Sequence, residues 1–223
     1  MVQATSVSGE TFDSCAGRWA ARARVIGLTS ALRYSVEAFL ISTGVVALAE
    51  IGDKTQLLAL LLAARFRKPV PIILGTLAAT LLNHALAGVA GRFVANVIGP
   101  AAMRWILGVS FIAMAVWTLI PDRLDEQQAE QPPRFGAFLT TLCAFFVLEM
   151  GDKTQIATVA LAAKYSSLVS VVAGTTLGMM IANVPVVLLG NGIAKRVPLR
   201  IVHAIAAGIF LVMGLAVLLS PMW

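Results

Sequence analysis

The chain has 223 residues and a mass of 23.5 kDa, with 59% apolar residues, 13% charged residues and a mean hydropathy of +0.88. Soluble domains carry about 25% charged residues, so this composition disfavours a disordered chain, a solvated enzyme domain and a coiled coil. The net charge of +6 resides in short basic clusters between apolar runs, which favours loops at a membrane surface over nucleic-acid binding.

The chain begins with a polar segment and continues as apolar runs joined by polar connections. Residues 1–35 form an arginine-bearing polar tail, which we expect to be flexible and to lie outside the functional unit. A transmembrane helix needs roughly 20 mainly apolar residues, and six runs meet this requirement. They cover residues 36–64, 70–91, 101–120, 135–163, 167–190 and 197–219. Because no run alternates with the period of a membrane strand, we predict an all-α polytopic protein with six transmembrane helices.

A seven-residue motif occurs twice. Residues 50–56 read E-I-G-D-K-T-Q and residues 149–155 read E-M-G-D-K-T-Q, so six of seven positions are identical at an offset of 99 residues. This offset also maps the first three apolar runs onto the last three. We therefore predict two three-helix repeats, residues 36–120 and 135–223, joined by an acidic linker, 121–134.

The predicted repeats have a consequence for topology. Because each repeat contains three helices, the second copy enters the bilayer from the opposite side, which makes an inverted-topology repeat. Secondary transporters built in this way bind their substrate near mid-membrane, where the repeats meet. Corresponding runs also carry small-residue pairs, Gly75 with Ala79 and Gly174 with Gly178. Such pairs permit close helix packing, although membrane helices are in any case rich in small residues.

Each motif places three ionisable side chains near the middle of an apolar run. Insertion scales assign each such group a cost of at least about 2.5–3.5 kcal/mol at the bilayer centre, so we expect all of them to face the protein interior. Helical spacing of i, i+3 and i+4 puts the members of one motif on one helix face. The glycines Gly52 and Gly151 permit either a close helix crossing or a local break that exposes carbonyl groups. The ionisable residues are Glu50, Asp53, Lys54, Glu149, Asp152 and Lys153.

The charges and ligand types of the motifs favour a divalent cation. Four carboxylates and two ammonium groups give a net charge of −2, which one divalent ion or two protons would neutralise. The candidate ligands are all oxygen atoms, which suit Mg²⁺, Ca²⁺ or Mn²⁺ better than Zn²⁺ or Cu²⁺. They belong to Glu50, Asp53, Thr55, Gln56, Glu149, Asp152, Thr154 and Gln155. We expect Lys54 and Lys153 to be counter-ions, since an ammonium group repels a metal ion, and we expect no resident cofactor.

Several other interpretations stay open at this point. The motifs could form buried ion pairs with a purely structural role. The protein could also export a cationic or zwitterionic metabolite such as an amino acid, conduct cations as a channel, or use paired carboxylates as an intramembrane enzyme. Asn83, His84 and Asn183 lie within apolar runs and could line a pathway or form interhelical hydrogen bonds.

The doubled motif resembles that of the Gdt-one-type cation exchangers of bacteria, plastids and the Golgi, over residues 36–219. The resemblance implies six helices and transport of Mn²⁺, with Ca²⁺ as the alternative, in exchange for protons. It also implies that the matching motif residues are the functional ones, namely Glu50, Gly52, Asp53, Lys54 and Thr55 together with Glu149, Gly151, Asp152, Lys153 and Thr154. We accordingly expect a manganese exporter of the bacterial inner membrane.

Overall fold

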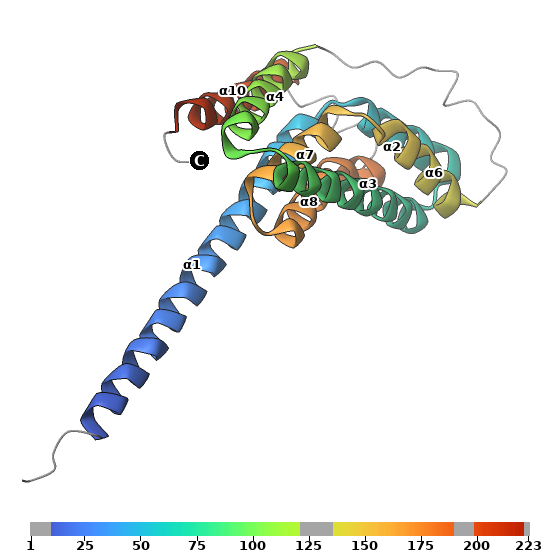
Figure 1. Cartoon of the computed structure of the whole chain (residues 1–223). Helices are drawn as coiled ribbons and strands as arrows, with labels where there is room; N and C mark the ends of the chain where they lie inside the picture. The colour runs from blue at the N-terminus through green and yellow to red at the C-terminus, as the bar shows by residue number, and fades with distance from the viewer. Residues whose placement is uncertain (1–9, 121–135, 190–198, 221–223) are drawn as a thin grey trace, which may run out of the picture.

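The computed structural model describes residues 10–120, 136–189 and 199–220, and the regular structure in these ranges is entirely helical (Figure 1). The all-α prediction is therefore confirmed. The eight helices are α1 (Glu10–Glu50), α2 (Lys54–Phe66), α3 (Pro69–Val97), α4 (Pro100–Thr118), α6 (Ala137–Glu149), α7 (Lys153–Lys164), α8 (Leu168–Leu189) and α10 (Leu199–Leu219).

Five of the described helices contain a stretch long and apolar enough to cross a membrane. These stretches are Thr29–Glu50, Pro69–Val97, Ala101–Thr118, Leu168–Leu189 and Arg200–Leu219. The fourth predicted span, the run 135–163, is not one continuous helix, because it is divided into the shorter helices α6 and α7. The run 36–64 is divided as well, but its first part is prolonged toward the N-terminus. Helix α1 begins at Glu10, within the tail that was expected to be flexible, and its N-terminal part projects away from the other helices (Figure 1).

Both divisions fall on a motif glycine. Gly52 has φ 84° and Gly151 has φ 79°, a left-handed conformation that costs other residues roughly 1–2 kcal/mol. The chain is helical up to Glu50 and becomes helical again at Lys54. Of the two alternatives predicted for Gly52 and Gly151, a close helix crossing or a local break of the helix, the structure shows the break. The predicted i, i+3, i+4 face does not exist, because no continuous helix runs through the motif.

The main helix packing joins segments from opposite sides of the 121–134 linker. Helix α8 packs against α1 and α2, whereas α3 packs against α6 and α7. Helices α4 and α10 pack side by side, and Figure 1 shows this pair at one edge of the molecule. Residues of α1, α4, α7 and α10 share one apolar cluster, and a second cluster joins α2, α3, α6 and α8. Helices α1, α2, α6 and α7 are therefore held by partners distant in sequence.

Three of the predicted small-residue positions are sites of close backbone approach, namely Gly75, Gly174 and Gly178. A Cβ atom on Gly174 of α8 would lie 2.5 Å from the Phe39 carbonyl oxygen of α1. A Cβ atom on Gly75 of α3 would lie 2.7 Å from the Phe138 carbonyl oxygen of α6. These glycines allow the crossings α8–α1 and α3–α6, so they have a packing role beyond general membrane composition.

A Gly174→Ala substitution is expected to destabilise the protein by about 1–3 kcal/mol, because the added methyl group meets main-chain atoms that cannot rotate away. Gly208→Ala is the matched control, since no atom of the described residues lies within 4 Å of a Cβ atom at that position of α10. Thermal unfolding of the two detergent-solubilised variants provides the comparison. Equal unfolding temperatures for both variants would contradict the close approach of α8 and α1.

Candidate metal site

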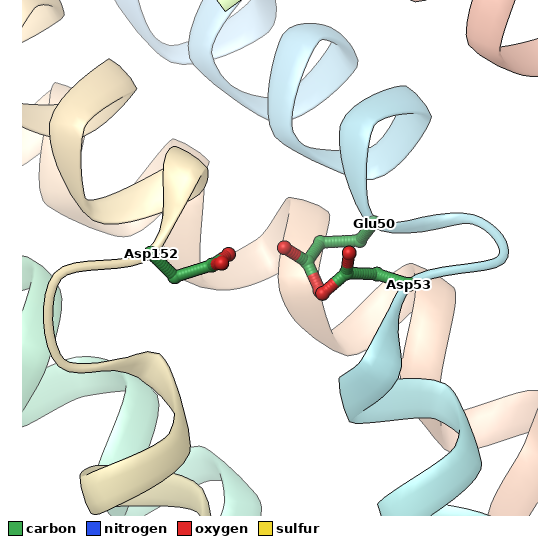
Figure 2. Close-up of side chains that lie close together, drawn as sticks. All are labelled: Glu50, Asp53 and Asp152. Carbon is green, nitrogen blue, oxygen red and sulfur yellow. The ribbon is translucent and has the colours of Figure 1, made fainter. Parts of the chain in front are cut away.

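Three buried carboxylates converge where the two breaks meet. Glu50 is the last residue of α1, Asp53 precedes α2, and Asp152 precedes α7, and their side chains point toward one another (Figure 2). One oxygen from each lies within 4.8 Å of the others, and the three residues are at most 2% exposed. Opposite oxygen ligands of a hard cation lie about 4.2–5.2 Å apart. The three oxygens therefore have a spacing that one divalent ion could bridge.

The two motif lysines form ion pairs across the site. The Nζ atom of Lys54 lies 2.9 Å from Oδ1 of Asp152, and the Nζ atom of Lys153 lies 2.5 Å from Oδ1 of Asp53. Each lysine therefore contacts an aspartate of the other motif, which is the contact expected of a counter-ion. The pairs differ in solvation, because the Lys54 side chain is 20% exposed and that of Lys153 only 1%.

The carboxylate oxygens divide into held and unpartnered atoms. Thr55 donates a hydrogen bond of 2.6 Å to Oε2 of Glu50, and Thr154 donates one of 3.1 Å to Oε2 of Glu149. Oε1 of both glutamates and Oδ2 of Asp152 are buried without a hydrogen-bond partner among the described residues. A buried oxygen with no partner is costly. These atoms are consequently favourable positions for a cation or a proton.

The helix ends add to the attraction for a positive ion. Glu50 ends α1 and Glu149 ends α6, and the carboxyl end of a helix carries the negative pole of its dipole. Asp53 and Asp152 instead occupy the N-cap positions of α2 and α7, where negative charge is favoured. The charge of each glutamate thus adds to the negative pole of its helix, so a positive ion is needed to stabilise it. Each aspartate is instead partly stabilised by the positive pole of the helix that it precedes.

Two predicted ligand types have other contacts. The Gly52 amide donates to Oε1 of Gln56 at 2.9 Å, and the Gly151 amide donates to Oε1 of Gln155 at 2.7 Å. Each glutamine therefore satisfies a main-chain group that its break leaves without a helical partner. The threonine hydroxyls are likewise bound to the glutamates. Glu149 is buried but does not belong to the group of three.

The remaining predicted polar residues lie outside that group. Asn83 of α3 donates to the Phe146 carbonyl of α6 at 3.0 Å, which is an interhelical hydrogen bond of the expected kind. Asn183 donates to the Met179 carbonyl of its own helix at 3.1 Å. His84 is fully buried, and neither ring nitrogen has a hydrogen-bond partner among the described residues. Their role in a pathway stays a prediction.

One residue near the breaks was not identified from the sequence. Nε2 of His203, on α10, lies 2.9 Å from the main-chain carbonyl oxygen of Ile51. A histidine near the start of the last apolar run is an unusual residue for such a segment. However, nothing in the sequence indicates that this run reaches the first motif.

The chain is similar to known transport proteins. A family model described as divalent cation/proton antiporter GDT1 matches residues 38–126 and 137–222. A Vibrio cholerae serotype O1 protein named "Putative manganese exporter" is 54% identical over 177 residues, 79% of this chain and 88% of that protein. A GDT1-like protein of Synechocystis is 30% identical over 183 residues, 74% of this chain and 88% of the relative. GDT1-like protein 5 of Arabidopsis thaliana is 27% identical over 223 residues, which cover 83% of this chain and 97% of the relative. No solved structure matches the chain.

Proposed function

The chain belongs to the GDT1 family of divalent cation/proton antiporters, and on this premise we propose that it exports Mn²⁺ in exchange for protons. It is an integral membrane protein with five membrane-length helices in the described part of the chain, and we place it in the bacterial inner membrane. The choice of Mn²⁺ over Ca²⁺ follows the name of the Vibrio cholerae relative. The observation that carries the proposal is the convergence of Glu50, Asp53 and Asp152 in a buried group.

The proposed substrate site combines carboxylates with three kinds of supporting residue, namely threonine, glutamine and lysine. Glu50, Asp53 and Asp152 supply the ligands, and Glu149, which is buried at the second break, is a further carboxylate of the site. Thr55 and Thr154 orient the glutamates, and the motif glutamines close the breaks. Lys54 and Lys153 neutralise two of the four carboxylates. The site therefore keeps a net charge of −2, which a divalent substrate can balance.

We further propose that the breaks belong to two inverted repeats. Contacts that are equivalent under the offset of 99 residues support this arrangement. The Lys54–Asp152 ion pair is equivalent to the Lys153–Asp53 ion pair. Phe111 and Phe210, which the same offset relates, stack on each other with ring centroids 6.4 Å apart. The two ranges matched by the family model also begin 99 residues apart. Six spans follow if each half-helix pair crosses the membrane as one unit.

The charge of the site supplies a mechanism of exchange. The divalent ion and protons compete for the same carboxylate oxygens, because each of them relieves the buried negative charge. A site that holds neither is unfavourable, so release of the metal on one side accompanies uptake of protons there. The unequal exposure of Lys54 and Lys153 supports a conformation in which the site is closer to solvent beside Lys54. Alternation of the two sides would reverse that difference.

Transport by purified protein in liposomes tests the proposal. With a manganese-sensitive dye inside, we expect Mn²⁺ uptake to increase severalfold when the lumen is made more acidic than the medium. Excess amino acid in place of the metal is expected to leave the proton gradient unchanged, which would not hold for a metabolite exporter. Uptake of Mn²⁺ that is insensitive to the pH gradient would contradict proton exchange and favour a channel.

A further inference from the structure

We propose that His203 is a positioning residue of the transport site, although it lies on α10 and outside both motifs. Its imidazole holds the carbonyl of Ile51, and through this contact it fixes the broken end of α1 that carries Glu50. The inference rests on the proposed function, because it assigns His203 a role in binding the transported ion.

The direction of the hydrogen bond follows from its partner. A carbonyl oxygen can only accept, so Nε2 of His203 carries the proton and donates it to Ile51 over 2.9 Å. The neighbouring groups of the break have partners of their own. The Asp53 amide donates to the Glu50 carbonyl at 3.0 Å, and the Gly52 amide donates to Gln56. His203 therefore supplies the partner for the carbonyl between them.

This contact links the site to a helix that is otherwise remote from it. Helix α10 packs mainly on α4 and touches α1 less extensively (Figure 1). The segment between α1 and α2 is not held by helical hydrogen bonds, so its position depends on individual contacts such as this one. Since Ile51 follows Glu50 directly, a shift of its carbonyl changes the direction of the Glu50 side chain. Loss of the imidazole should consequently affect metal binding more than maximal rate.

Among the residues that the structure describes, a histidine anchor of this kind occurs at only one of the two breaks. The offset of 99 residues relates His203 to Arg104, whose Nη1 instead lies 3.5 Å from the Ser220 carbonyl. The counterpart of Ile51 is Met150, a residue that is 56% exposed. The duplicated halves therefore differ here, because His203 of the second half holds the first break whereas the corresponding Arg104 contacts another residue.

Two substitutions separate an anchoring hydrogen bond from general packing. His203→Leu removes the donor, whereas His203→Gln places an amide N–H near the position of Nε2 and should restore the contact. In liposomes we expect His203→Leu to raise the KM for Mn²⁺ about tenfold with little change in maximal rate. His203→Gln is expected to stay within about threefold of the unsubstituted protein. Ile205→Ala, at a half-exposed position of the same helix, is the control for disturbance of α10.

Hydrogen–deuterium exchange tests the anchor without any transport. His203→Leu should increase deuterium uptake in peptides covering residues 47–57, whereas His203→Gln and Ile205→Ala should not. Unchanged uptake and an unchanged KM in His203→Leu would overturn the inference, and so would a His203→Gln variant as impaired as His203→Leu. If the unsubstituted protein did not transport Mn²⁺, only the proposed function would be contradicted. The hydrogen–deuterium exchange measurement would still test the anchor.

Discussion

Replacement of Glu50 by glutamine is expected to abolish Mn²⁺ exchange. The substitution keeps the shape of the side chain but removes a charge from the acidic group, where Oε1 of Glu50 is buried without a hydrogen-bond partner among the described residues. Loss of one member of a buried charged interaction typically costs 2–5 kcal/mol, which corresponds to roughly 30-fold to several thousand-fold in affinity. Glutamine also cannot exchange a proton with the metal. Initial rates of Mn²⁺ uptake in liposomes measure the effect.

Glu37→Gln is the matched control for this substitution. Glu37 lies on the same helix, but its carboxylate is near the Tyr165 hydroxyl, 3.5 Å away, rather than in the acidic group. We expect its Mn²⁺ uptake to remain within about twofold of the unsubstituted protein, since partly solvated contacts contribute little. Both variants should elute from size-exclusion chromatography as folded protein. Full uptake by Glu50→Gln would refute a role for this carboxylate in transport.

Replacement of Lys153 by methionine is expected to destabilise the protein by about 3–5 kcal/mol. Its ammonium group is almost completely buried against Asp53, and removal of one partner leaves an uncompensated charge in the interior. Lys54→Met should cost less, because the Lys54 side chain is 20% exposed and water can solvate Asp152 in its absence. Thermal unfolding in detergent at constant pH compares the two variants.

A double substitution separates the charge from the volume of the lysine. Asp53→Asn combined with Lys153→Met removes both charges of the pair, so much of the lost stability should return. Transport should not return, because the acidic group has lost one of its carboxylates. If Lys153→Met and Lys54→Met lowered the unfolding temperature equally, the difference in solvation between the two ion pairs would not have the effect that we assign to it.

Much of the site could be predicted because the motif is duplicated. The offset of 99 residues and the position of Glu50 and Glu149 within apolar runs indicated that acids from both halves face a common interior. The structure brings Glu50, Asp53 and Asp152 together and pairs each lysine with an aspartate of the other motif. Charged side chains buried in a medium of low polarity need neighbours of opposite charge. The types and spacing of the motif residues therefore predict which charges must lie together.

The helix breaks were harder to predict than the charges. An apolar run that contains glycine is compatible with a continuous helix, and only the left-handed φ of Gly52 and Gly151 distinguishes a break. Once the helix is divided, main-chain groups need new partners. That need explains why Gln56 and Gln155 contact the backbone, although their amide oxygens are equally suited to a metal.

The contact of His203 could not be predicted at all. It joins residues that are 152 positions apart, and it depends on how α10 packs against α1 rather than on a repeated pattern. The offset of 99 residues relates His203 to Arg104, so the internal repeat does not indicate a histidine contact either. Contacts that break the internal symmetry are the ones for which the sequence carries the weakest signal.

The most direct test of the account is to locate bound Mn²⁺ by anomalous diffraction from crystals soaked in manganese. We predict one strong anomalous peak about 2.0–2.6 Å from oxygens of Glu50, Asp53 and Asp152, lost in crystals of Glu50→Gln. A peak elsewhere in the protein, or saturating Mn²⁺ with no peak between these three carboxylates, would contradict the account.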